Sequence, residues 1–243
     1  NIGYMPLWDT RRGALTTYLC LARGDAGGGN LFDAHKKLYD HKNAVQKAAL
    51  DHAMLKAVAE EFQNMAEEGR KFFVVCPVQH QTVYNMDSYE HYKKQLAQIP
   101  MEHRKFLLLL VMNMDGSKPP KNAYWFAKPL RTLCPDIFAE IPLRRDINFS
   151  YLHNSGVNVA GVRLDKNAMP EHDTISMLNS FSSKAKSLKI PKTFVLDVSS
   201  LSITTSAVCA GFDFLGGSAI HDAVDKPDSV HRYHHADLIK TLV

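Results

Sequence analysis

Cysteine is scarce in this sequence: the 243 residues contain only four, and no two of them form a Cys-x-x-Cys pair. A tetrahedral zinc site is therefore not expected, because such sites are built from closely spaced cysteine and histidine ligands. Three of the four stand in or beside apolar segments, where free thiols are usually buried. We interpret them as the reduced thiols of a cytoplasmic protein. They are Cys20, Cys76, Cys134 and Cys209.

Long apolar runs are also missing. The longest, Phe106 to Met112, has the length of a strand, whereas a membrane-spanning helix needs about 18 residues. No signal-peptide pattern is present. We therefore expect no direct membrane insertion by this chain. Because it begins at Asn1 instead of methionine, we interpret it as part of a longer protein, whose other domains could tether it.

Clusters of one charge are missing as well. The 29 Lys and Arg residues nearly balance the 25 Asp and Glu residues, giving a net charge of +4, and the basic pairs are scattered. A nucleic-acid surface usually needs clustered Lys and Arg, so nucleic acid is not an expected partner. The glycine-rich stretch 24–30 lacks the Gly-Lys-Ser/Thr ending of a phosphate-binding loop. We interpret that stretch as a flexible connection.

The first pattern that is present is a hairpin. Two β-rich runs, Ile2 to Trp8 and Ala14 to Ala22, are joined by a loop that ends at Gly13. Next, apolar residues at three- and four-residue steps predict a long helix from the N-cap Asn43 to residue 68, followed by Gly69 as its stop. His52 lies on the apolar face of this helix and is interpreted as a packed or hydrogen-bonded residue.

Helix and strand patterns then alternate to the end of the chain. A helix over 87–98 begins with the capping signature Asp87-Ser-Tyr-Glu90. Further helices are predicted at 123–133, 146–153, 174–188 and 204–210 and at the end of the tail that starts at 228, and strands at 71–76, 106–112, 137–141, 157–164, 193–198 and 212–215. Apolar strands between helices indicate a parallel sheet that is covered on both faces. About eight strands and no linker predict one α/β domain over 1–243, folded as a (β/α)8 barrel.

The hairpin also carries a family resemblance. Its first strand, Tyr4-Met5-Pro6-Leu7-Trp8-Asp9, and its second, Leu19-Cys20-Leu21-Ala22-Arg23, resemble the Y-Q-P-I-x-D and E-A-L-L-R motifs of bacterial EAL domains. Near the other end, Gly211-Phe212-Asp213-Phe214-Leu215-Gly216-Gly217 is similar to the family's G-C-D-Y-V-Q-G turn. The resemblance implies a modified TIM-like barrel with an antiparallel first strand. Active members hydrolyse cyclic di-GMP with two Mg²⁺ or Mn²⁺ ions, which carboxylates hold at the C-terminal ends of the strands.

Most catalytic positions of that family carry other residues here. By the resemblance, the signature Glu falls on Leu19, the first-strand Gln on Met5, a metal-binding Asn on Pro77 and another Glu on Leu110. Leu and Pro side chains offer no oxygen to a divalent cation. We therefore predict no phosphodiesterase activity, no bound metal, no cofactor and no catalytic residue. We expect Leu19, Cys20 and Leu21 to fill the barrel interior.

Five polar residues remain as candidates for ligand binding, should the nucleotide bind. The resemblance places Arg23 against a dinucleotide phosphate, and it puts Arg163 where the family has a lysine. The complete set is Arg23, Glu140, Arg163, Asp165 and Asp197.

Three functions stay open at this point. The first is a catalytically inactive regulatory or protein-interaction module in bacterial signalling, with an unidentified signalling protein as partner. The second is a receptor that binds cyclic di-GMP without hydrolysing it. The third is a barrel enzyme of unrelated chemistry, for which His80 is a weak candidate as a catalytic residue.

The resemblance also implies that a homodimer can form through a face near the strand ends. The histidines at 231–235 are interpreted as solvated residues at a helix start.

Overall fold

Eight strands close into a barrel in the computed structural model, which describes residues 2–23, 30–114, 126–153, 155–165, 168–234 and Asp237. The strand order is β1-β8-β7-β6-β5-β4-β3-β2, and β1 also pairs with β2, which closes the ring. β1 runs antiparallel to both of its neighbours, whereas the pairs from β2 to β8 are parallel. The strands are β1 Ile2–Asp9, β2 Ala14–Ala22, β3 Phe73–Gln79, β4 Leu107–Met112, β5 Ile137–Glu140, β6 Val159–Arg163, β7 Lys192–Leu196 and β8 Phe214–Gly216. The predicted barrel with an antiparallel first strand is confirmed.

The connection between β1 and β2 shows why the chain starts as a hairpin. The Asp9 carboxylate accepts hydrogen bonds from the backbone N–H groups of Arg11 and Arg12, at 3.1 and 3.0 Å. Gly13 follows with φ of +59°, a left-handed conformation that glycine adopts without steric cost. The local sequence therefore fixes the turn.

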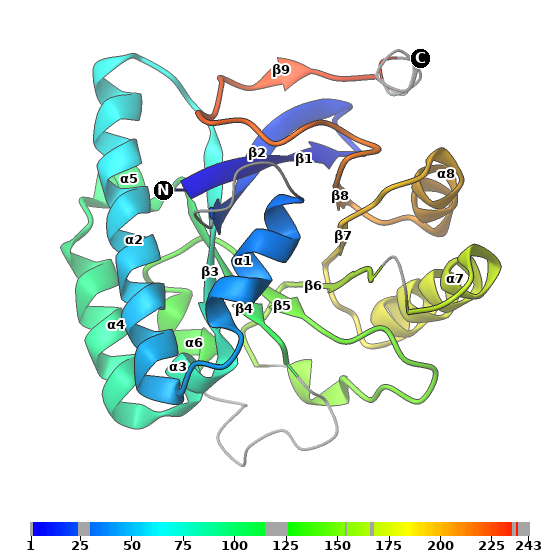
Figure 1. Cartoon of the computed structure of the whole chain (residues 1–243), viewed down its shortest axis with the longest axis horizontal. Coiled ribbons are helices and arrows are strands. Elements are labelled where there is room, and N and C mark those ends of the chain that lie inside the picture. Colours follow the sequence, from blue (N-terminus) through cyan, green and yellow to red (C-terminus); the bar gives the residue numbers. More distant parts are fainter. Residues whose placement is uncertain are drawn as a thin grey trace.

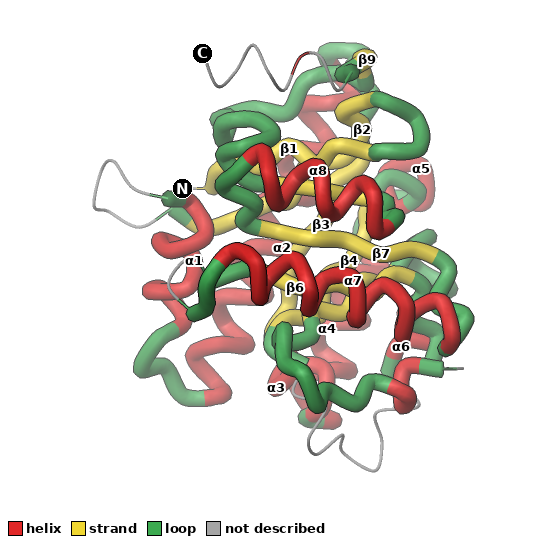
Figure 2. The backbone as a smooth tube through the Cα atoms, turned by 90° about the vertical axis from the view of Figure 1, so that its right-hand side faces the viewer, coloured by secondary structure: helices red, strands yellow, loops and turns green. Residues whose placement is uncertain are grey.

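Helices surround the ring of strands (Figure 1), and α7 and α8 lie side by side on one flank (Figure 2). The helices are α1 Leu31–Tyr39, α2 Ala44–Glu67, α3 His80–Tyr84, α4 Met86–Gln98, α5 Met101–Arg104, α6 Ala127–Leu130, α7 Glu171–Ser187 and α8 Leu201–Ala210. Asn43 caps α2 as predicted, through a hydrogen bond from the Gln46 N–H. The capping assignment for α4 was wrong by two residues, because Asn85 accepts the Ser88 N–H and Asp87 lies inside the first turn.

One predicted helix has a different structure, and the tail contains a strand that was not predicted. Within 146–153 only a 3-10 turn forms, at Ser150–Leu152, because the Asn148 side chain accepts the Ser150 N–H and competes with helical bonding. The tail from 228 contains a short strand, β9 His231–Arg232, antiparallel to β2. His231 therefore lies in a strand and does not begin a helix, whereas Asp237 further along the tail is helical. His235, residues 24–29 of the glycine-rich stretch and residues 123–125 of a predicted helix lie outside the described residues.

Alternation along the strands divides the buried apolar residues into two layers. One layer lies between the strands and the surrounding helices. The other fills the barrel and is called the interior cluster below. The interior cluster consists of Met5, Leu7, Leu19, Leu21, Leu31, Phe32, Val75, Leu108, Leu110, Met112, Phe138, Val159, Phe194, Leu196 and Phe214. Leu19 and Leu21 thus fill the interior as expected, but Cys20 belongs to the outer layer, because neighbouring strand residues face opposite sides.

Among the described residues, no helix is both long enough and apolar enough to cross a membrane.

His52 is half-buried, and its Nδ1 lies within hydrogen-bond distance of the Gln95 side chain. The prediction of a packed or hydrogen-bonded histidine is therefore confirmed.

Candidate functional site

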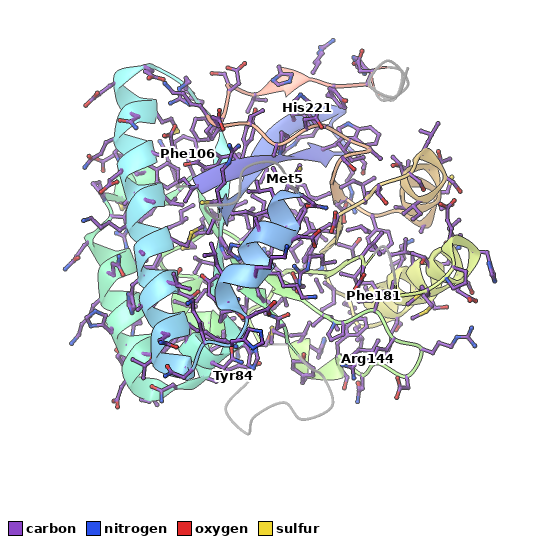
Figure 3. The ribbon with its side chains drawn as sticks, in the orientation of Figure 1. Met5, Tyr84, Phe106, Arg144, Phe181 and His221 are labelled. Carbon is purple, nitrogen blue, oxygen red and sulfur yellow. The ribbon has the colours of Figure 1, made fainter. Side chains whose placement is uncertain are left out.

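Helix α1 lies across one end of the barrel (Figures 1 and 2). This end carries the C-terminal ends of the parallel strands, because α1 is the next element after β2 and is bonded to residues at the ends of two other strands. Asn30 at its start bonds to Asp197, directly after β7, and Tyr39 at its end bonds to Asp51, which in turn bonds to the last residue of β3. Two side chains of α1, Leu31 and Phe32, enter the interior cluster. Met5, labelled in Figure 3 beside the start of α1, belongs to the same cluster. The mouth of the barrel is thus partly filled by hydrocarbon.

Three anchors hold α1 in this position. At its start, the Asn30 side chain accepts the Phe32 N–H and donates through Nδ2 to Asp197, at 2.9 Å. In its middle, His35 Nδ1 accepts the backbone N–H of Ala22 at 3.0 Å. At its end, the Tyr39 hydroxyl donates to Asp51 of α2, at 2.8 Å.

The last anchor belongs to a fully buried network. The Asp51 carboxylate also accepts the Gln79 N–H at 3.0 Å and the Thr82 hydroxyl at 2.5 Å, at the junction of β3 and α3. Burial raises the pKa of Asp51 to about 6, although all three hydrogen bonds act to lower it. This carboxylate therefore joins α1, α2 and the end of β3.

A cavity of about 460 Å³ opens beside α1 at the strand ends. Four of the five predicted ligand-binding residues line it: Glu140, Arg163, Asp165 and Asp197. They come from the ends of β5, β6 and β7, which the parallel topology brings to one edge. The sequence analysis missed other polar residues of the lining, namely Asp33 and Lys36 of α1, Asn113 after β4 and Thr174 of α7.

Glu140 and Arg163 form the buried polar centre of this cavity. Arg163 Nη2 lies 3.7 Å from Glu140 Oε1, and the carboxylate side chain is only 6% exposed. Glu140 Oε2 is buried and has no hydrogen-bond partner among the described residues. Burial raises the pKa of Glu140, while the Arg163 charge and the Asn113 N–H lower it in part.

The backbone is strained at two of the strand ends. Asn113 and Asp197 have φ of +56° and +60°, in the left-handed region that only glycine enters without cost. The Asn113 amide donates to Gln79 at 3.0 Å, and Asp197 accepts the bond from Asn30. Such strain is common at ligand sites. In the sequence, the feature that could have indicated these two positions is an Asn or Asp directly after an apolar strand.

Arg23 is not brought to this cavity. Its Nη2 lies 2.7 Å from Asp225 Oδ1, and its side chain lines a different groove, between the β1–β2 hairpin and α2. The structure thus separates Arg23 from the other four predicted residues. His80 is also elsewhere: its ring packs edge-on against Tyr84, with centroids 5.6 Å apart, and it is not among the described residues that line the cavity.

The residues present do not fit a two-metal centre. Met5, Leu19 and Leu110 lie in the interior cluster, each at most 5% exposed. In the described part of the chain, no three His, Cys, Asp or Glu side chains are grouped closely enough to hold a metal ion.

Comparison with known proteins gives a match in structure but not in sequence. No family model and no curated protein matches the chain. The Xanthomonas citri FimX EAL domain in complex with c-diGMP has a TM-score of 0.62 at 16% identity, over 92% of this chain and 87% of that one. The PaMucR phosphodiesterase in its c-di-GMP complex has a TM-score of 0.64 at 12% identity, over 92% of this chain and 96% of that one. An EAL domain protein from Listeria monocytogenes EGD-e has a TM-score of 0.64 at 12% identity, over 92% of this chain and 88% of that one. The chain therefore has the fold of EAL domains.

Proposed function

We propose that this chain is a catalytically inactive EAL-like domain that acts as a regulatory, protein-interaction module in bacterial signalling. One observation carries the proposal: beneath the mouth of the barrel, Leu19 and Leu110 pack in the interior cluster together with Phe32 of α1. By the resemblance of the motifs, these two leucines stand where active members have metal-binding glutamates.

The chemistry of hydrolysis explains why that packing matters. A two-metal centre holds its ions about 4 Å apart with oxygen ligands, and the ions activate water and stabilise the developing charge. Leucine side chains supply neither charge nor lone pairs. Arg163 adds a fixed positive charge beside Glu140, which disfavours a cation at this edge.

The direct test is a hydrolysis assay with cyclic di-GMP and Mg²⁺ or Mn²⁺, with the PaMucR phosphodiesterase as the positive control. We expect no turnover by this chain and no thermal stabilisation by either metal. Turnover at an ordinary enzymatic rate that is lost in the Asp197→Asn variant would contradict the proposal.

The partner is proposed to be another signalling protein, and three exposed apolar side chains offer contact points. Val45, Met86 and Met101 are 78%, 68% and 77% exposed, and they stand at or beside the starts of α2, α4 and α5. A pull-down from the host's lysate, with and without cyclic di-GMP, should return the same protein in both conditions. The triple variant Val45→Ser, Met86→Ser, Met101→Ser tests whether that partner contacts any of these side chains.

A second candidate is a receptor that binds cyclic di-GMP without hydrolysing it. The cavity of about 460 Å³ favours it, because ligand pockets range from about 300 to 1,000 Å³. Calorimetric titration with cyclic di-GMP separates the two candidates. Micromolar binding that Arg163→Ala weakens would support the receptor, and Arg144→Ala is the matched control. Arg144 is exposed and lies apart from α1 (Figure 3).

A barrel enzyme of unrelated chemistry has less support. The raised pKa of Glu140 in a polar cavity is a feature that catalytic acids share. However, the described lining contains no His, Cys, Ser or Tyr side chain, and the groups that could act beside Glu140 are Thr174, Lys36 and the aspartates.

A further inference from the structure

We propose that this protein binds a small tetrahedral oxyanion, phosphate or sulfate, in a second cavity beneath α1, between His35, Lys36, Lys47 and Arg163. This cavity has a volume of about 100 Å³ and also touches the amide side chains of Gln79 and Asn113. The proposal does not rest on the proposed function, because neither hydrolysis nor a protein partner enters the argument, and the two cavities share Lys36, Asn113 and Arg163.

The first observation is a buried donor without an acceptor. His35 is 1% exposed, and its Nδ1 accepts the Ala22 N–H, so the neutral ring carries its proton on Nε2. Nε2 is buried and has no hydrogen-bond partner within the described residues. A buried polar group in this state costs free energy, which an anionic acceptor would recover.

The second observation is an excess of positive charge. Lys36, Lys47 and Arg163 line the cavity, and Asp40 is the one acidic residue in its described lining. Neither lysine lies within ion-pair distance of an acidic side chain in the part of the chain that the structure describes. Arg163 is 3.7 Å from Glu140, a long contact that leaves guanidinium N–H groups available to a second acceptor.

The volume of the cavity and its donors favour a compact ligand. At about 100 Å³ the cavity is smaller than the range of about 300 to 1,000 Å³ that is usual for pockets of drug-sized ligands. A tetrahedral oxyanion accepts hydrogen bonds in several directions, which suits donors from α1, α2, β4 and β6 around one centre.

The test is calorimetric titration of the whole chain with inorganic phosphate and with sulfate, at constant ionic strength set by chloride. We expect saturable binding of both anions that is about tenfold weaker in Lys36→Ala and in Lys47→Ala, the loss of one charge-assisted bond. Lys37→Ala is the matched control, because Lys37 is exposed on the same helix and outside the described lining. It should bind like the unmodified chain.

A second measurement reports on His35 without a substitution in the core. In ¹⁵N-edited NMR of the imidazole groups, phosphate should shift the His35 Nε2–H resonance and slow its exchange with solvent. The proposal is overturned by any of three results: phosphate binds no more tightly than chloride, the variants Lys36→Ala and Lys47→Ala bind phosphate as tightly as the control Lys37→Ala, or phosphate does not shift the His35 resonance.

Discussion

Asn30 and Asp197 are 167 residues apart in the sequence and are joined by a hydrogen bond of 2.9 Å between Asn30 Nδ2 and Asp197 Oδ1. The bond ties the start of α1 to the end of β7, and Asn30 is also the N-cap of the helix. One side chain therefore starts the helix and positions it over the barrel.

Asn30→Ala should lower the free energy of unfolding by about 2 kcal/mol, because both the cap and the bond to a carboxylate are lost. A double-mutant cycle with Asp197→Ala should give a coupling energy of about 1 kcal/mol. Urea unfolding measures both quantities. Asn43→Ala, which removes the cap of α2, is the control and should show no coupling to residue 197. Additive effects of the first pair would contradict the expectation.

Asp51→Ala should destabilise the fold by about 3 kcal/mol or more, because three buried donors lose their acceptor at once. Glu60→Ala, an exposed change on the same helix, should have an effect within about 0.5 kcal/mol. Urea unfolding at pH 7 compares the two variants. A loss in Asp51→Ala as small as that in the control would show that the network contributes little.

Asp51 should also change the dependence of stability on pH. Its pKa is raised from 3.8 to about 6 on folding, so the folded state binds the proton more tightly between these values. The contribution of this residue therefore grows by about 2 kcal/mol as the pH falls from 6 to 4. The difference in unfolding free energy between the unmodified chain and Asp51→Asn, measured across this window, checks the sign. An opposite slope would mean that the hydrogen bonds outweigh burial.

His35 should change the dependence of stability on pH in the opposite direction to Asp51. Burial, with a smaller contribution from the Arg163 charge, lowers the pKa of His35 from 6.5 to about 3. Between these values the unfolded chain binds a proton that the folded chain does not, so stability is lost as the pH falls through this range. His35→Gln can keep the acceptor for the Ala22 N–H and does not titrate. Relative to this variant, the unmodified chain should become progressively less stable below pH 6.5, and equal slopes would refute the expectation.

Leu19→Glu should not restore a metal site. The new carboxylate would lie in the interior cluster, where an uncompensated charge costs on the order of 3 to 5 kcal/mol. We expect a large fall in the melting temperature that Mg²⁺ or Mn²⁺ does not reverse. Leu19→Met, which conserves volume, should cost less than about 1.5 kcal/mol. Recovery of stability with either metal would show that oxygen ligands do converge there.

The sequence predicted the barrel because its signals are local. Fully apolar strands such as Leu107–Met112, and the hairpin turn at Gly13, specify their own structure. The error at 146–153 arose because a side chain, Asn148, competes with the helical backbone. The strand at 231–232 was missed because its pairing with β2 is a contact between the two ends of the chain.

The site was predictable where a residue stands at or just beyond the end of a strand. Glu140, Arg163, Asp165 and Asp197 all stand at strand ends, so the parallel topology alone brings them together. The position of Arg23 depends on Asp225, far away in the sequence, and no local pattern indicates that ion pair. Helix α1 was not predicted at all, although its Leu31, Phe32 and His35 decide what the mouth of the barrel can hold.

The antiparallel first strand has a consequence for how this chain reaches its folded state. β1 is synthesised before the other strands of the barrel, yet its second neighbour in the ring, β8, begins only at Phe214. Pairing between such distant segments slows folding, because a long loop must close before the contacts form. Until then, β1 and β7 each expose an open edge, which invites pairing with other chains. Truncation before Phe214 should therefore produce an aggregating polypeptide instead of a smaller stable domain.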